Sequence, residues 1–380
     1  MQSANTPDYG RGSTADGAHD NCHCPDSVAH MTIAIVQTAF LGDVLLTLPL
    51  CAAIRQLMPD ARIVFITTPT AAGFIDGLPY TDDVVAFDKR GVHRSGKGLR
   101  ALISARCTNV DVALVPHTSF RTMRFVKAMR PRSIVTFKNT WTRWLRGAHV
   151  LRYPQELHDA DRHLQLLRGI DSNFVVNKEG VEPLRLHTPE DKASARRLIG
   201  DGHLIGDALS IGDGHYIVLA PGTVWPTKQW PLEYVNDLAQ QLAGQNYRVI
   251  VVGDASVRDK IATHENICDL AGRTSLRQAA AVIAGASVVV ANDSAPLHIA
   301  SLQGVPVVGV FGPTVREFGF GPFGPHAHIV ERTDLACRPC SNHGSMRCPI
   351  RTHVCMRSIT PQQVRDTVID LLERIGYSVE

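Results

Sequence analysis

The sequence predicts an α/β protein with two domains, each built on an open parallel sheet that helices cover on both faces. Short apolar runs of strand length alternate with helical patterns along most of the chain, which is typical of this class. The alternation is interrupted once, between about residues 175 and 205, and then starts again. A chain of 380 residues is long enough for two hydrophobic cores.

The first half of the chain contains five predicted strands. A helix is predicted from Gly42 to about Leu57, with a kink at Pro49, and helical spacing returns over Gln155–Arg168. The predicted strands are Thr32–Gln37, Arg62–Thr67, Val84–Phe87, Asp111–Val115 and Ser133–Phe137.

The second half restarts the pattern after a Gly- and Asp-rich stretch. We expect a disordered extension over residues 1–30, a first domain over 31–190, a second over 205–358 and a closing helix over 360–380. Strands are predicted at Tyr216–Ala220, Tyr247–Val252, Ser287–Ala291 and Val307–Phe311, and helices at Leu232–Ala243 and Pro361–Ile375.

Composition places the chain among ordinary globular proteins, with 44% hydrophobic residues and a net charge of +3. No run approaches 18 apolar residues, so no transmembrane helix is predicted. The first 30 residues lack the apolar core of a signal peptide. Nine cysteines without an export signal favour reduced thiols, and we expect a cytoplasmic protein.

Charge is unevenly distributed. The span from Arg121 to Arg152 contains nine Lys and Arg residues and no Asp or Glu. Such a span suits nucleic acid, an anionic membrane surface or an acidic sugar-lipid acceptor. Separate solvated helix faces would give the same composition.

The segment Asn292–His298 joins a predicted strand to a predicted helix. Small and capping residues at this position expose a helix N-terminus, whose N–H groups and positive dipole end suit a phosphate. Asp293 either caps the helix or holds sugar or ribose hydroxyls while the following amides bind phosphates. His298 faces either the core or the ligand. The segment indicates a nucleotide or nucleotide-sugar site.

Two further loops carry charged residues. Lys228 stands between two tryptophans in a proline-stiffened loop, where it either covers apolar surface or neutralises a diphosphate. Asp43 follows the first strand at the head of a helix, either as a capping acid or as a carboxylate facing a cleft between the domains. No Gly-x-Gly-x-x-Gly follows that strand, which argues against a dinucleotide-binding fold.

Two clusters resemble metal sites. Cys337, Cys340, Cys348 and Cys355 have spacings that fit a tetrahedral zinc or iron site, although reduced thiols packing a loop would look the same. Asp159-Ala160-Asp161 resembles an acid pair that holds a divalent ion, but it falls inside a helical pattern and is interpreted as a solvated helix face.

Taken together, the motifs resemble glycosyltransferase family 9, the heptosyltransferases of lipopolysaccharide synthesis, over about residues 31–375. The resemblance rests on order and spacing along one chain. Its motifs are Leu41–Pro49, Lys228-x-Trp230-Pro231, Asn292–His298, Phe311–Thr314 and the late cysteine run, which looks like the second heptosyltransferase branch.

The resemblance implies a GT-B architecture, in which two Rossmann-like domains with parallel sheets face each other across a cleft. It implies transfer of heptose from ADP-L-glycero-D-manno-heptose to the inner core of lipopolysaccharide, with inversion and without a catalytic metal. Asp43 would be the general base. The implied donor residues are Thr223, Lys228, Asp293, Ser294, Ala295 and His298, and the candidate acceptor residues are His117, Arg121 and Arg124.

Some features leave the substrates open. Many family members have Gly where this chain has Ala295, and some have a hydroxyl residue at Val224, so the nucleotide sugar is not fixed. The alternatives are a relative with another sugar or a protein acceptor, and a non-catalytic nucleotide-sugar binder. We expect no nucleic-acid partner. Any contact with the inner membrane is expected at its cytoplasmic face and should be weakened by salt.

Overall fold

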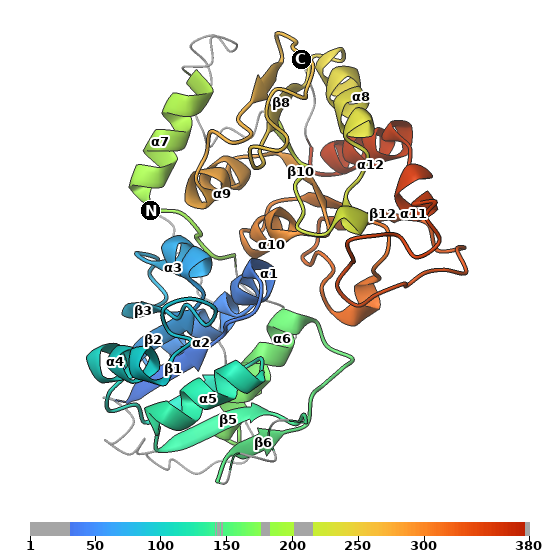
Figure 1. Cartoon of the computed structure of the whole chain (residues 1–380). Coiled ribbons are helices and arrows are strands. Elements are labelled where there is room, and N and C mark those ends of the chain that lie inside the picture. The colour runs from blue at the N-terminus through green and yellow to red at the C-terminus, as the bar shows by residue number, and fades with distance from the viewer. Residues whose placement is uncertain are drawn as a thin grey trace, which may run out of the picture. The chain divides into compact units, whose positions relative to one another are not determined.

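The computed structural model describes residues 31–140, 142, 145, 147–175, 183–200 and 216–376. The predicted extension over residues 1–30 lies outside this described part. The chain divides into two compact units, Met1–Glu182 and Pro183–Glu380. Figure 1 shows that each unit has a sheet with helices on both of its faces, which is the predicted α/β class.

The first unit holds a six-stranded sheet in the order β3-β2-β1-β4-β5-β6, and every neighbouring pair is parallel. The strands are β1 (Thr32–Val36), β2 (Arg62–Thr67), β3 (Asp83–Ala86), β4 (Val112–Val115), β5 (Ser133–Phe137) and β6 (His149–Leu151). The helices are α1 (Leu41–Leu45), α2 (Leu48–Leu57), α3 (Pro69–Ile75), α4 (Gly96–Arg106), α5 (Phe120–Met129) and α6 (Asp159–Leu164), which a 3₁₀ turn, η2 (Gln165–Gly169), extends.

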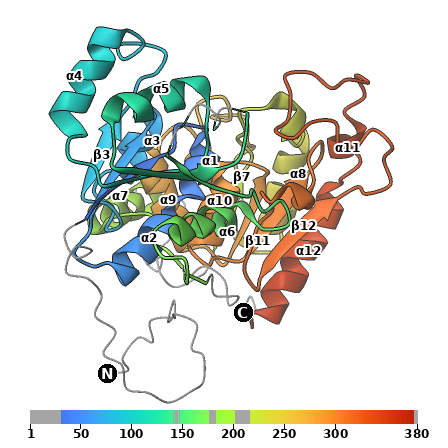
Figure 2. The same cartoon turned by 90° about the horizontal axis from the view of Figure 1, so that it is seen from below.

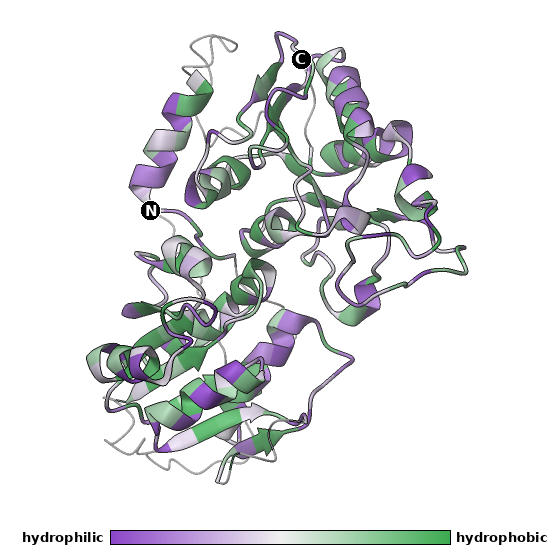
Figure 3. Ribbon diagram, in the orientation of Figure 1, coloured by the Kyte–Doolittle hydropathy of each residue, from purple (hydrophilic) through white to green (hydrophobic). Residues whose placement is uncertain are grey.

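The central strands β1 and β4 of this unit are mostly apolar because both faces of the sheet are buried there. Ala34 and Val36 pack in the core under α4 and α5, while Ile33 and Ile35, which alternate with them, are fully buried on the opposite face. Figure 3 shows the resulting contrast between apolar strands and helices with polar outer faces.

The second unit repeats this topology. Its sheet has the order β12-β11-β10-β7-β8-β9, again wholly parallel. The strands are β7 (Tyr216–Ala220), β8 (Arg248–Val251), β9 (Ile267–Asp269), β10 (Val288–Asn292), β11 (Val307–Phe311) and β12 (Ala327–Glu331). The helical elements are α7 (Pro189–Gly200), η3 (Pro226–Lys228), α8 (Leu232–Ala243), α9 (Leu276–Ala284), α10 (Ala295–Leu302), η4 (Arg316–Phe318), α11 (Val354–Arg357) and α12 (Pro361–Arg374).

Figure 2 shows α8 and α12 together beside the second sheet, and the residues of these two helices share one buried core with β7, β8, β10 and β11. In both units the chain leaves the central strand first toward one edge of the sheet and later toward the other. This reversal lies between β1 and β4 in the first unit and between β7 and β10 in the second. Ligands of open α/β sheets bind beyond the carboxyl ends of strands at such a reversal.

The predicted helix from Gly42 to Leu57 is two helices. The chain breaks at Leu46 and Thr47, and Pro49 stands in the first turn of α2, where its missing N–H costs nothing. The predicted kink at Pro49 is therefore confirmed as a complete break.

Candidate functional site

The reversal point of the second sheet carries the predicted donor residues. Asn292 ends β10 and joins two loops there: its Nδ2 donates to the carbonyl of Pro221 at 2.6 Å, and its Oδ1 accepts from the backbone N–H of Trp230 at 3.3 Å. A buried amide with both ends bonded fixes the loop after β7 against the loop after β10. Sequence reasoning gave Asn292 no role of its own.

Lys228 and Asp293 meet in this loop pair. The Nζ atom of Lys228 lies 2.6 Å from Oδ2 of Asp293, and both side chains are buried. The same oxygen accepts a hydrogen bond of 2.6 Å from the hydroxyl of Thr314, which follows β11. Lys228 is thus a buried cation with a fixed counter-charge. The interpretation that it is a surface lysine covering apolar area is therefore wrong.

The start of α10 lies directly beyond this ion pair. Ser294 is the N-cap residue, and its hydroxyl oxygen is buried with no hydrogen-bond partner in the described part of the chain. Ala295 opens the helix, so its amide has no intrahelical partner. A buried hydroxyl and a helix N-terminus beside a lysine are groups that an anion would satisfy.

The remaining donor candidates occupy the same unit. Thr223 lies in the loop after β7, where its hydroxyl accepts from the backbone N–H of Trp225 at 3.3 Å. His298 is buried in the second turn of α10. All six predicted donor residues therefore stand on the loops after β7 and β10 or at the start of α10.

Asp43 lies near the reversal point of the first sheet. Its Oδ2 atom accepts the backbone N–H of Phe40 at 3.1 Å, which caps α1 as the ordinary interpretation expected. His117 follows β4, the neighbour of β1. Although the side chain is solvent-accessible, desolvation by nearby protein atoms lowers the pKa of His117, and Asp43 opposes this shift by raising it. Desolvation thus favours the neutral imidazole, and the nearby charge of Asp43 favours the protonated one.

A buried network holds the helix break behind Asp43. The hydroxyl of Thr47 donates to the Asp43 carbonyl at 2.8 Å, and His163 Nδ1 lies 3.1 Å from that hydroxyl. On its other side, His163 Nε2 lies 3.4 Å from a carboxylate oxygen of Asp159, which also pairs with Arg162 at 3.4 Å. Asp159 is 4% exposed, so its interpretation as part of a solvated helix face is wrong.

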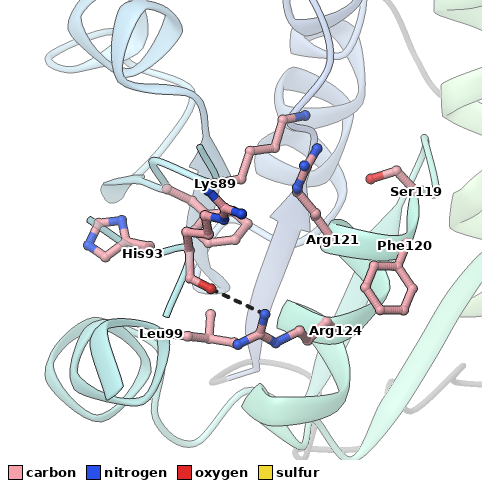
Figure 4. Close-up of a pocket in the computed structure, with 9 residues that line it drawn as sticks. Lys89, His93, Leu99, Ser119, Phe120, Arg121 and Arg124 are labelled. Atoms are coloured by element: carbon pink, nitrogen blue, oxygen red, sulfur yellow. Dashed lines mark hydrogen bonds between the residues drawn. The ribbon is translucent and has the colours of Figure 1, made fainter. Parts of the chain in front are cut away.

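A basic pocket opens beside the first sheet. Its cavity of about 560 Å³ is lined by nine residues, none of them acidic: Phe87, Lys89, His93, Arg94, Leu99, Ser119, Phe120, Arg121 and Arg124. Figure 4 shows Arg121 and Arg124 reaching into it from α5, with Lys89 and His93 coming from the segment after β3. Two predicted acceptor residues, Arg121 and Arg124, thus share a pocket with two cations, Lys89 and Arg94, that sequence reasoning missed.

The positive charges in and beside the basic pocket repel one another. Burial lowers the pKa of Lys89, and the charges of Arg90 and Arg121 lower it further. Lys89 donates to the backbone carbonyl of Thr38 after β1, and Arg124 donates to the carbonyl of Arg94 at 3.2 Å. Neutral carbonyls leave the positive charge uncompensated, so an anion would relieve the repulsion.

Comparison with known proteins decides the family. The sequence profile of glycosyltransferase family 9 (heptosyltransferase) matches residues 99–350. The chain belongs to this family. The matched segment contains the Lys228–Asp293 pair and the first three of the four late cysteines. The predicted family is therefore confirmed, and the protein is a glycosyltransferase.

Relatives within family 9 align along the chain. Lipopolysaccharide heptosyltransferase 2 of Salmonella typhimurium is 29% identical over 372 residues, covering 91% of this chain and 100% of its own. The solved structure of E. coli ADP-heptose lps heptosyltransferase II has a TM-score of 0.70 at 20% identity, over 91% of this chain and all of that one. E. coli heptosyltransferase WaaC with ADP-2-deoxy-2-fluoro heptose has a TM-score of 0.64 at 20% identity, over 90% and 99%. These structures confirm the predicted fold class.

The four late cysteines of this family 9 protein lie together. Cys337, Cys340, Cys348 and Cys355 line one cavity of about 50 Å³, and all four are free thiols. In the described ranges, no group of three or more His, Cys, Asp or Glu side chains is arranged to hold a metal ion. The structural zinc or iron site at these four cysteines therefore stays a prediction, beside the interpretation as reduced thiols packing a loop.

The basic span from Arg121 to Arg152 is only partly described, because Trp141, Trp144 and two of its arginines lie outside the described residues. Within the described residues, no helix is long and apolar enough to cross a membrane.

Proposed function

We propose that this protein is an inverting transferase that moves L-glycero-D-manno-heptose from ADP-heptose to the inner core of lipopolysaccharide. The observation that carries the proposal is the buried Lys228–Asp293 pair beside the N-terminus of α10, at the reversal point of the second sheet. Family membership and the names of the aligned relatives supply the donor and acceptor class.

On the donor side, positive charge meets the diphosphate. Lys228 and the amides at the start of α10 would stabilise the charge that develops on the departing ADP, and the orphaned Ser294 hydroxyl would donate to it. Thr223 would bind phosphate, Asp293 would hold sugar hydroxyls beside Lys228, and His298 would line the donor site. This arrangement supplies the charge stabilisation that a divalent ion supplies in other sugar transferases.

On the acceptor side, Asp43 would act as general base. The acceptor hydroxyl gives its proton to the Asp43 carboxylate while its oxygen attacks the anomeric carbon. The bond from that carbon to the diphosphate oxygen breaks on the opposite face, and ADP leaves with the electron pair. One displacement inverts the anomeric centre, and a positioned base contributes on the order of 10²–10⁴-fold in rate.

The basic pocket would hold the anionic groups of the acceptor. Inner-core saccharides on lipid carry phosphates and acidic sugars, and the pocket offers Lys89, Arg94, Arg121 and Arg124 without a neighbouring acid in its wall. His117, near Asp43, would contact the acceptor closer to the reacting hydroxyl. The same charges suit a salt-sensitive contact with the cytoplasmic face of the inner membrane.

The deciding experiment measures ADP release from ADP-heptose with and without a truncated lipopolysaccharide core acceptor. Wild type is compared with Asp43→Asn, which keeps the shape of the side chain and its capping oxygen, and with Asp60→Asn, an exposed control. We expect acceptor-dependent release that falls at least 100-fold in Asp43→Asn and is unchanged in Asp60→Asn. Absence of release by wild type with several core acceptors would reject the proposal in favour of another donor sugar or a protein acceptor.

A further inference from the structure

An irregular segment joins β12 to α11, and its residues 336–353 are called here the cysteine loop. Its base is tied to the sheet end near the ion pair. The N–H of Cys340 donates to the carbonyl of Pro313 at 3.1 Å, and Arg338 donates to the carbonyl of Thr314 at 2.7 Å. Arg338 also pairs with Glu331 at the end of β12. The base of the cysteine loop is therefore bonded to Thr314, the residue whose hydroxyl donates to Asp293.

The far part of the cysteine loop binds the residue before Lys228. The buried hydroxyl of Thr227 donates to the carbonyl of Ser345 at 2.9 Å and accepts from the N–H of Ser345 at 2.8 Å. The N–H of Thr227 donates to the same carbonyl at 3.3 Å, and His353 Nε2 lies 2.7 Å from the carbonyl of Thr227. Every polar group of Thr227 is thus bonded to the cysteine loop.

Gly344 brings this loop into contact with Lys228 itself. Its backbone has a φ of +88°, which favours glycine. A Cβ atom at Gly344 would stand 2.8 Å from Cβ of Trp225, which is closer than real Cβ atoms approach, and 3.1 Å from Cε of Lys228, which is tighter than most contacts of a Cβ atom. The backbone at residue 344 therefore forms the wall along which the Lys228 side chain runs to Asp293.

We propose that the cysteine loop positions a residue of the donor site. Through Thr227, Ser345 and Gly344, the loop holds Lys228 in line with Asp293. Lys228 has four flexible methylene groups, and the short η3 turn that carries it has few bonds of its own. The contacts from the cysteine loop fix both the backbone before Lys228 and the path of its side chain. The proposal deepens the proposed function, on which the role of Lys228 toward a diphosphate rests.

The first test uses two glycine variants with positive φ. Gly344→Ala adds a methyl group against Trp225 and Lys228, whereas Gly324→Ala adds one at φ +104° with no atom within 4 Å. Both carry backbone strain, and only the first pushes on Lys228. We expect Gly344→Ala to lower kcat/KM for the nucleotide sugar about tenfold, with KM for the acceptor unchanged, and Gly324→Ala to leave both unchanged. Equal loss in the two variants would overturn the proposal.

A second pair of variants tests Thr227. Thr227→Val keeps the shape but loses the hydroxyl that bonds Ser345, and Thr227→Ser restores it. We expect Thr227→Val to lose about tenfold in kcat/KM for the nucleotide sugar and Thr227→Ser to recover most of it. If Thr227→Val lowers only the melting temperature, the contact is structural and the proposal fails.

A third measurement needs no substrate. The ion pair shields the Lys228 amine, so its rate of acetylation by an amine-specific reagent, followed by peptide mass spectrometry, reports its position. We expect this rate to rise severalfold in Gly344→Ala and not in Gly324→Ala. A rise in a protein that transfers no heptose would support the positioning role while rejecting the proposed function, and an unchanged rate would reject the positioning role.

Discussion

Removing the charge of Asp293 tests how the donor loops are held together. In Asp293→Asn the Lys228 ammonium stays buried and loses its counter-charge, while the amide oxygen still accepts a hydrogen bond. Breaking a buried ion pair lowers the free energy of unfolding by about 3–5 kcal/mol. Because the hydrogen bond is retained in this variant, we expect a loss near the lower limit, about 3 kcal/mol. For a unit the size of residues 183–380, each kcal/mol lowers the melting temperature by about 2–4 °C, so we expect a drop of roughly 6–12 °C.

The coupling between the two charges is measured with a double-mutant cycle, in which calorimetry compares wild type, Asp293→Asn, Lys228→Met and the double variant. Lys228→Met leaves the carboxylate buried with Thr314 as its remaining partner, so we expect a loss of similar size. The double variant removes both charges, and because an apolar replacement of a buried pair is often neutral, it should be more stable than either single variant. This account of the pair would be refuted if the loss of unfolding free energy in the double variant equalled the sum of the two single losses. A loss below about 1 kcal/mol in Asp293→Asn would also refute it.

Three other predictions concern the first unit and the thiols. Arg121→Ala should raise the acceptor KM about tenfold, equivalent to about 1.4 kcal/mol, and weaken its salt dependence, whereas Lys127→Ala, exposed on the same helix, should change neither in a steady-state assay. His163→Ala should lower kcat by about 10-fold or more without changing the donor KM, because it frees the helix break behind Asp43; an unchanged kcat would contradict this. Burial opposes ionisation of Cys348, but four backbone N–H groups outweigh it and lower its pKa, whereas burial raises the pKa of Cys355 to about 11. Since the thiolate reacts, alkylation followed by mass spectrometry should modify Cys348 at lower pH than Cys355, and the reverse order would contradict the assignment.

The central strands could be predicted from the sequence because they are buried on both faces. Strands such as Val288–Asn292 are apolar up to their last residue, and their limits agree with the predicted ones to within about a residue. The edge strands β6, β9 and β12 were not predicted. They are three to five residues long and only partly apolar, so their pairing depends on a neighbour that is remote in sequence.

Residues of the candidate site could likewise be predicted only where a local sequence pattern marks them. Asp43, Lys228 and Asp293 were found because each stands in a short motif after a strand. The contacts that hold them were not predicted, since the link from Lys228 to Asp293 spans 65 positions and the link from His163 to Thr47 spans 116. Lys89 and Arg94 were missed because no motif marks them, and only the fold brings them beside α5.

The repeated strand order gives each unit a site for one of the charged residues that the proposed reaction would use. In each unit the reversal point exposes the loops after two neighbouring central strands, and in each unit a charged residue stands on a short helical turn there, Asp43 on α1 and Lys228 on η3. A short turn has too few internal bonds to hold a side chain rigidly. Each is held by a remote segment, α6 behind Asp43 and the cysteine loop behind Lys228. In the proposed transfer, the positions of Asp43 and Lys228 would therefore depend on residues outside the motifs. Variants of those supporting residues should lower kcat more than they weaken binding of the substrate on the other unit.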